Sequence, residues 1–125
     1  MQLVTPLAAP SLAHSLALVG QPATPVKEQL TESELQCEVI NLAKQYGHLV
    51  HHVYDSRRAT GPGFPDLVIA GKNHVLFAEL KSAGGNRSPS QTSWAYRLIA
   101  AGQHYVLWRP KDLIAGSIEA VLADL

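Results

Sequence analysis

The chain has 125 residues, enough for one domain with a single core, and its formal net charge is zero. Its only cysteine, Cys37, excludes an internal disulfide framework and a cysteine-based metal site within one chain, which predicts a reducing, cytoplasmic location. No apolar run approaches transmembrane length and no basic residue precedes the first apolar stretch, so we expect neither a membrane partner nor a signal peptide.

Residues 1–30 are rich in alanine, leucine and proline, and Lys27 and Glu28 are their only Lys, Arg, Asp or Glu residues. We expect an irregular lead-in here and a folded domain over residues 31–125. Thr31 as N-cap and Glu34 three positions later form a capping box, and apolar residues then follow at helical spacing until Gly47. The sequence therefore predicts a helix over residues 31–47.

The segment from Leu49 to Tyr54 predicts a first strand, and a polar loop with the adjacent arginines Arg57 and Arg58 follows it. Two apolar runs, residues 63–70 and 75–81, flank the short segment 71–74, which indicates a β-hairpin. Arginines on a loop that leads into this hairpin suit contact with phosphate.

The register of the hairpin follows from its turn. If the turn is centred between Lys72 and Asn73, directly opposed residues have numbers that sum to 145, and Asp66 then faces Glu79 at a Cβ separation of ~5 Å. Lys81 lies two residues beyond Glu79 and shares its face, whereas the Leu80 side chain points to the other face.

Two carboxylates and an ammonium on one face are costly to hold together, because like charges repel and burial penalises each charge. A divalent cation removes that cost, and oxygen ligands suit Mg²⁺ or Mn²⁺. A plain Glu–Lys or Asp–Lys pair on a solvated sheet edge is the alternative. Residues 44–111 carry nine Lys and Arg against three Asp and Glu, a balance of +6, as expected if this stretch meets a polyanion; solvated surface charge is the alternative.

The remaining elements follow the hairpin. Ser88 as N-cap, Pro89 and the capping-box partner Gln91 begin a helix that ends at Gly102. We expect its face made by Gln91, Trp94, Leu98 and Ile99 to pack on the sheet. A last strand, 104–108, and a C-terminal helix, 112–125, complete a compact α/β sandwich on a mixed sheet of about four strands flanked by helices.

Residues 31–112 resemble the VRR-NUC branch of the PD-(D/E)XK nuclease superfamily, which has a restriction-endonuclease-like fold. The resemblance is carried by Gly-Phe-Pro-Asp-Leu-Val from Gly63, by Phe-Ala-Glu-Leu-Lys-Ser from Phe77, by Ser-Pro-Ser-Gln-Thr-Ser-Trp from Ser88, and by the strand that ends in Trp-Arg-Pro at Pro110. Pro-Asp with a distant Glu-x-Lys is a weak motif alone, and the register and the flanking motifs make it more specific.

The resemblance implies a Mg²⁺- or Mn²⁺-dependent DNA endonuclease, from a bacterium or a phage-infected cell. It assigns metal binding to Asp66, Glu79 and the Leu80 carbonyl, activation of water to Lys81, and a place beside the site to Gln91. A residue of the first helix often completes such sites; Glu34 is our choice, with Gln36 and Glu38 as the alternatives. Arg57, Arg58 and Arg87 are candidate DNA contacts. Stand-alone relatives are associated with branched DNA, including four-way junctions, and work as homodimers.

Two other functions stay open at this point. The first is a non-catalytic nucleic-acid-binding module on the same fold, which would bind DNA without cutting it. The second is a structural or assembly protein whose hairpin charges merely pair, and whose thermal stability would not respond to a metal.

Overall fold

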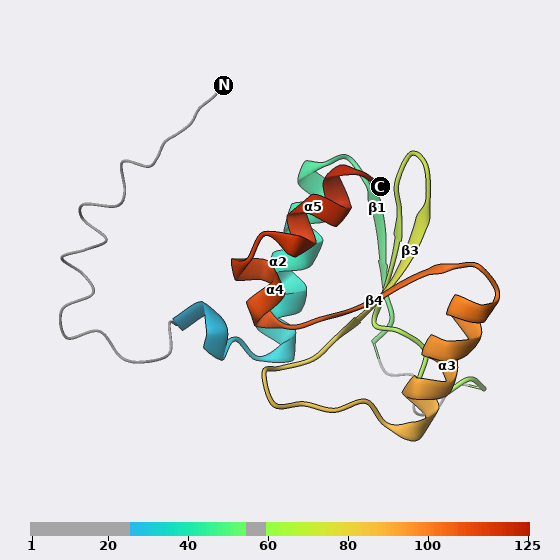
Figure 1. The fold of residues 1–125 in the computed structure, drawn as a ribbon. Coiled ribbons are helices and arrows are strands. Elements are labelled where there is room, and N and C mark those ends of the chain that lie inside the picture. The colour runs from blue at the N-terminus through green and yellow to red at the C-terminus, as the bar shows by residue number, and fades with distance from the viewer. Residues whose placement is uncertain (1–25, 55–59) are drawn as a thin grey trace, which may run out of the picture.

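The structure, a computed structural model, describes residues 26–54 and 60–125 (Figure 1). Most of the expected lead-in and the arginines Arg57 and Arg58 lie outside these residues. The last part of the lead-in range is a 3-10 helix, η2 (Val26–Gln29), which packs against the later helix α4 (Pro110–Ile114).

A mixed four-stranded sheet forms the centre of the fold, as predicted. Its strands are β1 (Leu49–His52), β2 (Leu67–Ala70), β3 (Val75–Leu80) and β4 (His104–Trp108), in the order β1-β2-β3-β4. Strand β2 is antiparallel to both β1 and β3, and β4 runs parallel to β3. Strand β1 ends two residues before the predicted end at Tyr54.

The predicted hairpin register is confirmed. Leu67 pairs with Ala78, and Ala70 pairs with Val75, so the numbers of paired residues sum to 145. The same register, extended by one residue, sets Asp66 opposite Glu79. A slip of one position would send one of these side chains to the other face of the sheet.

Both predicted capping boxes are present. Helix α2 (Glu32–Gln45) begins after Thr31, whose hydroxyl accepts the Glu34 N–H, and helix α3 (Pro89–Ala100) begins after Ser88, whose hydroxyl accepts the Gln91 N–H. Because these signals involve only four consecutive residues, sequence alone was enough to locate the helix starts.

The prediction of one C-terminal helix over residues 112–125 was wrong. The segment forms two short helices, α4 and α5 (Ser117–Ala123). Gly116 separates them with a φ of +81°, a left-handed conformation that glycine adopts readily. Pro110 at the first position of α4 starts that helix earlier than predicted.

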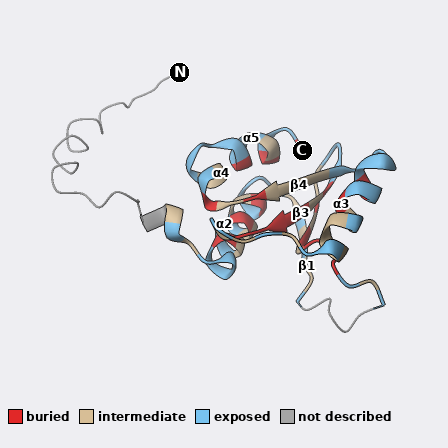
Figure 2. Ribbon diagram, turned by 60° about the horizontal axis from the view of Figure 1, so that its bottom comes forward, coloured by how far each residue is buried: buried red, intermediate tan, exposed pale blue. Residues whose placement is uncertain are grey.

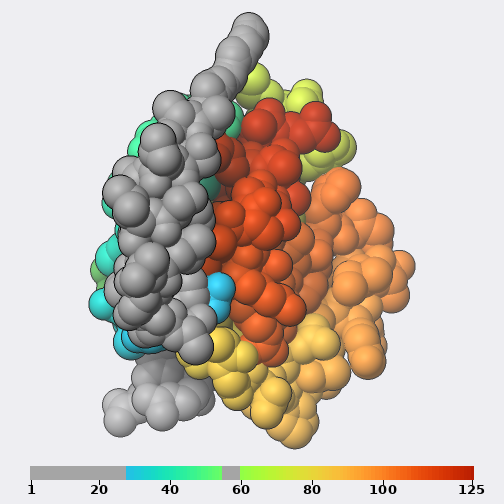
Figure 3. Space-filling view, turned by 60° about the vertical axis from the view of Figure 1, so that its left-hand side comes forward, coloured from blue at the N-terminus to red at the C-terminus, as the bar shows by residue number. Residues whose placement is uncertain are grey.

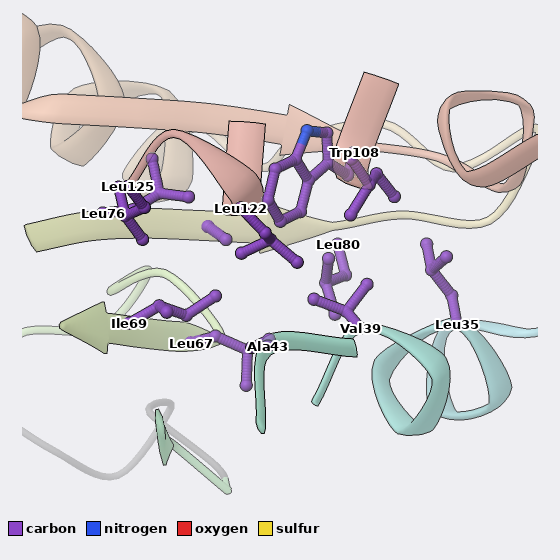
Figure 4. Packing of buried hydrophobic residues seen from close by; sticks show 12 residues of the cluster. Leu35, Val39, Ala43, Leu67, Ile69, Leu76, Leu80, Trp108, Leu122 and Leu125 are labelled. Atoms are coloured by element: carbon purple, nitrogen blue, oxygen red, sulfur yellow. The ribbon is translucent and has the colours of Figure 1, made fainter. Parts of the chain in front are cut away.

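The helices cover the two faces of the sheet unequally. Helices α2, α4 and α5 lie on one side and α3 lies on the other (Figures 1 and 2). The main core fills the space between the sheet and helices α2 and α5; in Figure 4, Leu80 and Trp108 from the strands meet Val39 of α2 and Leu122 of α5. The space-filling view shows α4 and α5 on the outside, with the loop after β3 beside them and α3 at the flank (Figure 3).

The second face of the sheet carries the motif residues. Leu67, Ala78 and Leu80 belong to the main core, so alternation along the strands turns Phe77 and Glu79 toward α3. Phe64 packs edge-on against Phe77 at 6.0 Å between ring centroids and against Trp94 of α3 at 5.0 Å. These rings attach α3 to the loop that leads into β2.

Helix α3 packs differently from the prediction at one position. Ala95 and Leu98 are buried, and Gln91 and Trp94 are half-buried, but Ile99 is 55% exposed and does not pack on the sheet. Among the described residues, no helix is both long enough and apolar enough to cross a membrane.

Candidate functional site

The hairpin brings Asp66 and Glu79 together at its open end. Asp66 directly precedes β2, and its backbone oxygen accepts a hydrogen bond of 2.8 Å from the Val53 N–H. Its carboxylate Oδ2 accepts a second bond of 2.8 Å from the Leu80 N–H, across the hairpin. Two backbone groups, one just after β1 and one at the end of β3, therefore fix the position of Asp66.

Glu79 is the most buried charged side chain of the described residues, with 1% of its surface exposed. Its Oε2 accepts a hydrogen bond of 3.0 Å from Nε2 of Gln91, and the Lys81 ammonium lies 3.8 Å from the same oxygen. Lys81 is itself only 8% exposed. The structure thus brings together four predicted site residues, Asp66, Glu79, Lys81 and Gln91, on one face of the sheet.

The single amide of Gln91 has two partners. Its Oε1 accepts a 2.8 Å hydrogen bond from the Ser88 N–H, which is the capping-box bond, while its Nε2 donates to Glu79. An amide can do both because it carries a separate acceptor and donor. The cap therefore holds the Gln91 side chain in the orientation that contacts the carboxylate.

Burial raises the pKa of Glu79 to about 8, and the charge and hydrogen bonding of the neighbouring Asp66 carboxyl act in the same direction. Lys81 opposes this shift, and Glu32 of α2 adds a further small increase. One ammonium thus does not compensate the buried Glu79 carboxylate and the half-buried Asp66 carboxylate beside it. This is the electrostatic setting in which a cation stabilises the ionised pair.

The donor set fits a hard divalent cation. Asp66 and Glu79 offer carboxylate oxygens, and Leu80, between Glu79 and Lys81, lines the same cavity as Asp66. Mg²⁺ is usually held by one or two carboxylates together with waters and substrate oxygens, rather than by a complete protein cage. No group of three or more His, Cys, Asp and Glu side chains that could hold a metal occurs in the described part of the chain.

Two cavities flank this centre. One, of about 450 Å³, lies toward the start of α2 and is lined by Glu32, Ser33, Gln36, His52, Tyr54, Asp66 and Leu80. The other, of about 460 Å³, lies toward α3 and is lined by Pro62, Gly63, Lys81, Asn86, Ser88, Ser90 and Gln91. Asp66 thus borders the first cavity and Lys81 and Gln91 border the second, while Glu79 lies buried between them.

The first-helix residue that we chose does not face this centre. The Glu34 carboxylate accepts a 2.9 Å hydrogen bond from the Thr31 N–H, which completes the capping box, and Glu34 does not line the cavity. Glu38 is exposed and does not line it either. Glu32, which we had not considered, and Gln36, one of the alternatives, occupy that wall instead.

Of the three arginines predicted to contact DNA, only Arg87 lies within the described residues. Arg57 and Arg58 fall outside the described residues. Arg87 lies in the loop between β3 and α3, where its Nη1 is 3.5 Å from the Tyr105 hydroxyl, to which it donates. Burial raises the pKa of Tyr105, so this hydroxyl stays protonated at neutral pH.

Sequence reasoning missed two residues that position the site. Gly63 has a φ of +88° and packs against the start of α3. Arg109 donates from Nη1 to the backbone oxygens of Ser82 and Gly85, at 2.8 and 2.6 Å, and so ties down the loop after Lys81. Both belong to the quoted motifs, and that membership was the available signal.

Comparison with known proteins supports the resemblance to VRR-NUC domains that the sequence motifs indicate. No family model and no curated protein matches the chain. A solved structure named "VRR_NUC domain protein" is 28% identical, with a TM-score of 0.55 over 73% of this chain and 87% of that chain. Another, named "VRR_NUC domain", matches in fold at 22% identity, with a TM-score of 0.56 over 70% and 95% of the two chains. The predicted motifs, their register and this structural likeness support a VRR-NUC domain, and they are consistent with the PD-(D/E)XK superfamily.

Proposed function

We propose that the protein is a Mg²⁺- or Mn²⁺-dependent endonuclease that hydrolyses phosphodiester bonds in DNA. The observation that carries the proposal is the buried Glu79 carboxylate, which contacts Lys81 and Gln91 and faces Asp66. If the hairpin charges merely paired on the surface, there would be no reason to bury the Glu79 carboxylate, which is 1% exposed, beside a second carboxylate, because burial of a charge is costly. The names of the two similar structures support a nuclease-type domain.

Asp66, Glu79 and the Leu80 carbonyl would hold the cation. When bound, the cation polarises the scissile phosphate and lowers the pKa of a bound water toward neutrality. The hairpin register sets the two carboxylates opposite each other on one face of the sheet, where they would share the cation.

Lys81 and Gln91 supply the remaining chemistry from the chain itself. The Lys81 ammonium lies on the side of Glu79 that opens into the cavity near α3, where it can orient an incoming water and offset charge on phosphate oxygens. Gln91 holds the Glu79 carboxylate through its amide N–H. Arg87, and Arg57 and Arg58 on their loop, would contact the DNA backbone.

Branched DNA, including four-way junctions, is the proposed substrate, and a homodimer is the proposed assembly. The supporting arguments are the resemblance and the small size of the chain, which covers little DNA alone; a two-fold dimer would present two sites to two strands. Linear duplex, flap and junction substrates in Mn²⁺, together with a solution mass measurement, test both proposals.

The central test is cleavage by purified Lys81→Met protein in Mn²⁺. We expect cleavage to be lost while thermal unfolding and DNA binding remain, and we expect the same for Asp66→Asn and Glu79→Gln. Lys72→Met removes an exposed lysine from the hairpin turn and serves as the matched control, with full activity. Undiminished cleavage by Lys81→Met would exclude the proposed mechanism, and wild-type protein that binds DNA without cutting it would indicate the non-catalytic module.

A further inference from the structure

The cavity on the α2 side of the site has an exposed aromatic wall. Tyr54 is 90% exposed, although it carries a large ring, and that ring packs on His52 at 4.4 Å between centroids, tilted by 45°. Both residues line the cavity that also contains Asp66. The Tyr54 ring is therefore supported by the His52 ring, while most of its surface is exposed and can accept another planar group.

The polar lining of this cavity indicates the chemistry of its ligand. Among the residues that the structure describes, the lining includes two acidic groups, Glu32 and Asp66, and no lysine or arginine. Ser33 and Gln36 can both donate and accept hydrogen bonds, and the Gln36 amide lies 3.5 Å from the His52 ring. Such a lining suits a neutral, flat ligand with N–H groups on its edge.

The size and position of the cavity further limit which flat ligand it can bind. Its volume of about 450 Å³ falls in the range of small-molecule sites, roughly 300–1,000 Å³. If Asp66 helps to bind the scissile phosphate, then whatever part of the DNA enters the rest of this cavity belongs to the nucleotide next to that phosphate. A base can enter a side cavity and stack on an aromatic ring only when it has left its duplex stack, because pairing and stacking occupy its edge and both its faces.

We propose that this cavity binds an unpaired nucleobase, stacked on Tyr54, next to the phosphate that is cut. The proposal rests on the proposed nuclease function and names the substrate class more closely, as DNA with at least one unpaired nucleotide at the site. Tyr54 and His52 provide the stacking surface, and Gln36 and Glu32 contact the edge of the base. Fully paired duplex offers no base to this cavity.

The test measures base binding separately from cleavage. Short oligonucleotides with 2-aminopurine, whose fluorescence reports stacking, are titrated with the full chain in EDTA, as single strands and as matched duplexes. We expect quenching with the single strand only. Tyr54→Ala should weaken the binding by about 5- to 150-fold, the range for loss of one stacked base, and Tyr54→Phe should restore it. Tyr96→Ala, which removes a tyrosine that is 66% exposed on α3, is the control and should bind as wild type.

The outcomes distinguish this inference from the nuclease proposal. Equal quenching by wild-type and Tyr54→Ala proteins, or equal quenching of paired and unpaired 2-aminopurine, overturns the base site whatever the cleavage assay gives. Tyr54-dependent quenching by a protein that does not cut DNA in Mn²⁺ overturns the nuclease proposal and leaves the base site standing. In an active enzyme, Tyr54→Ala should slow cleavage of flap DNA, which carries unpaired nucleotides, more than Tyr96→Ala does.

Discussion

Gly63→Ala is the substitution that most directly tests how the site is assembled. Gly63 adopts a φ of +88°, and a Cβ built on it would lie 2.6 Å from the Ser90 carbonyl carbon and 2.7 Å from the Gln91 nitrogen. Those atoms are backbone at the start of α3, so no side-chain rotation can relieve the contact. The substitution should therefore push α3 away from the motif loop.

The structure gives the size of this effect. Ordinary contact begins at 3.4 Å, so the two segments must separate by about 0.8 Å. If α3 moves directly away from the sheet, the bond from Gln91 to Glu79 lengthens from 3.0 Å to about 3.8 Å, which is no longer a hydrogen bond. Loss of a hydrogen bond to a charged group costs about 1.5–3 kcal/mol, which corresponds to a roughly 10- to 150-fold slower reaction.

Gly47→Ala separates this displacement from backbone strain. Gly47 has a φ of +81° with nothing within 4 Å of its Cβ position, so alanine there costs only the left-handed strain of about 1–2 kcal/mol. Gly63→Ala adds overpacking of about 1–3 kcal/mol. Urea unfolding compares the two losses of stability, and single-turnover cleavage of DNA in Mn²⁺ compares the rates. Equal stabilities and equal rates for the two variants would refute the reasoning.

A double variant shows whether Gly63 acts through Gln91. If it does, Gln91→Ala alone should slow cleavage as much as Gly63→Ala, and the combined variant should be little slower than either one, because the same contact is lost only once. Multiplicative rate losses would show that the two residues act independently.

Three further predictions follow from contacts around the site. Arg109→Met should speed amide hydrogen exchange over residues 82–87 and slow cleavage, because it removes the donor to the backbone oxygens of Ser82 and Gly85. Lys111→Met removes a neighbouring exposed cation and should change neither the exchange nor the cleavage rate. Glu34→Ala should lower the free energy of unfolding by about 1 kcal/mol through its cap while leaving the cleavage rate unchanged; a large rate loss would return Glu34 to the site. The pKa of Glu79 is raised from 4.5 to about 8. Metal-free protein should therefore lose stability as the pH rises from 4.5 to about 8, because the folded state must give up a proton that it holds more tightly than the unfolded state does. The gain in thermal stability on adding Mn²⁺ should increase over the same pH range. Glu79→Gln should abolish that growth, and a pH-independent gain in wild type would contradict the prediction.

The parts of the fold that sequence predicted are those set by local rules. The register of β2 and β3 follows from a short turn and strict alternation, and these alone predict that Asp66 lies opposite Glu79. The break at Gly116 was not predictable in this way, since one glycine inside a helical pattern costs only about 1 kcal/mol. Packing of Ile118 and Leu122 on the core requires the change of direction that Gly116 allows.

Gln91 and Glu34 show why the same local signal gave opposite outcomes at the site. Each is the third residue of a helix and completes a capping box, so sequence gave each a structural role that could compete with a functional one. The amide of Gln91 uses its oxygen for the cap and still has an N–H for Glu79. The carboxylate of Glu34 has no donor, and the cap turns it away from the cavity toward Thr31. A glutamate at position 91 would complete the same capping box but would present a further carboxylate to Glu79, which already repels Asp66. The chemistry of the site therefore requires glutamine at this cap, whereas the cap of α2 requires only an acceptor.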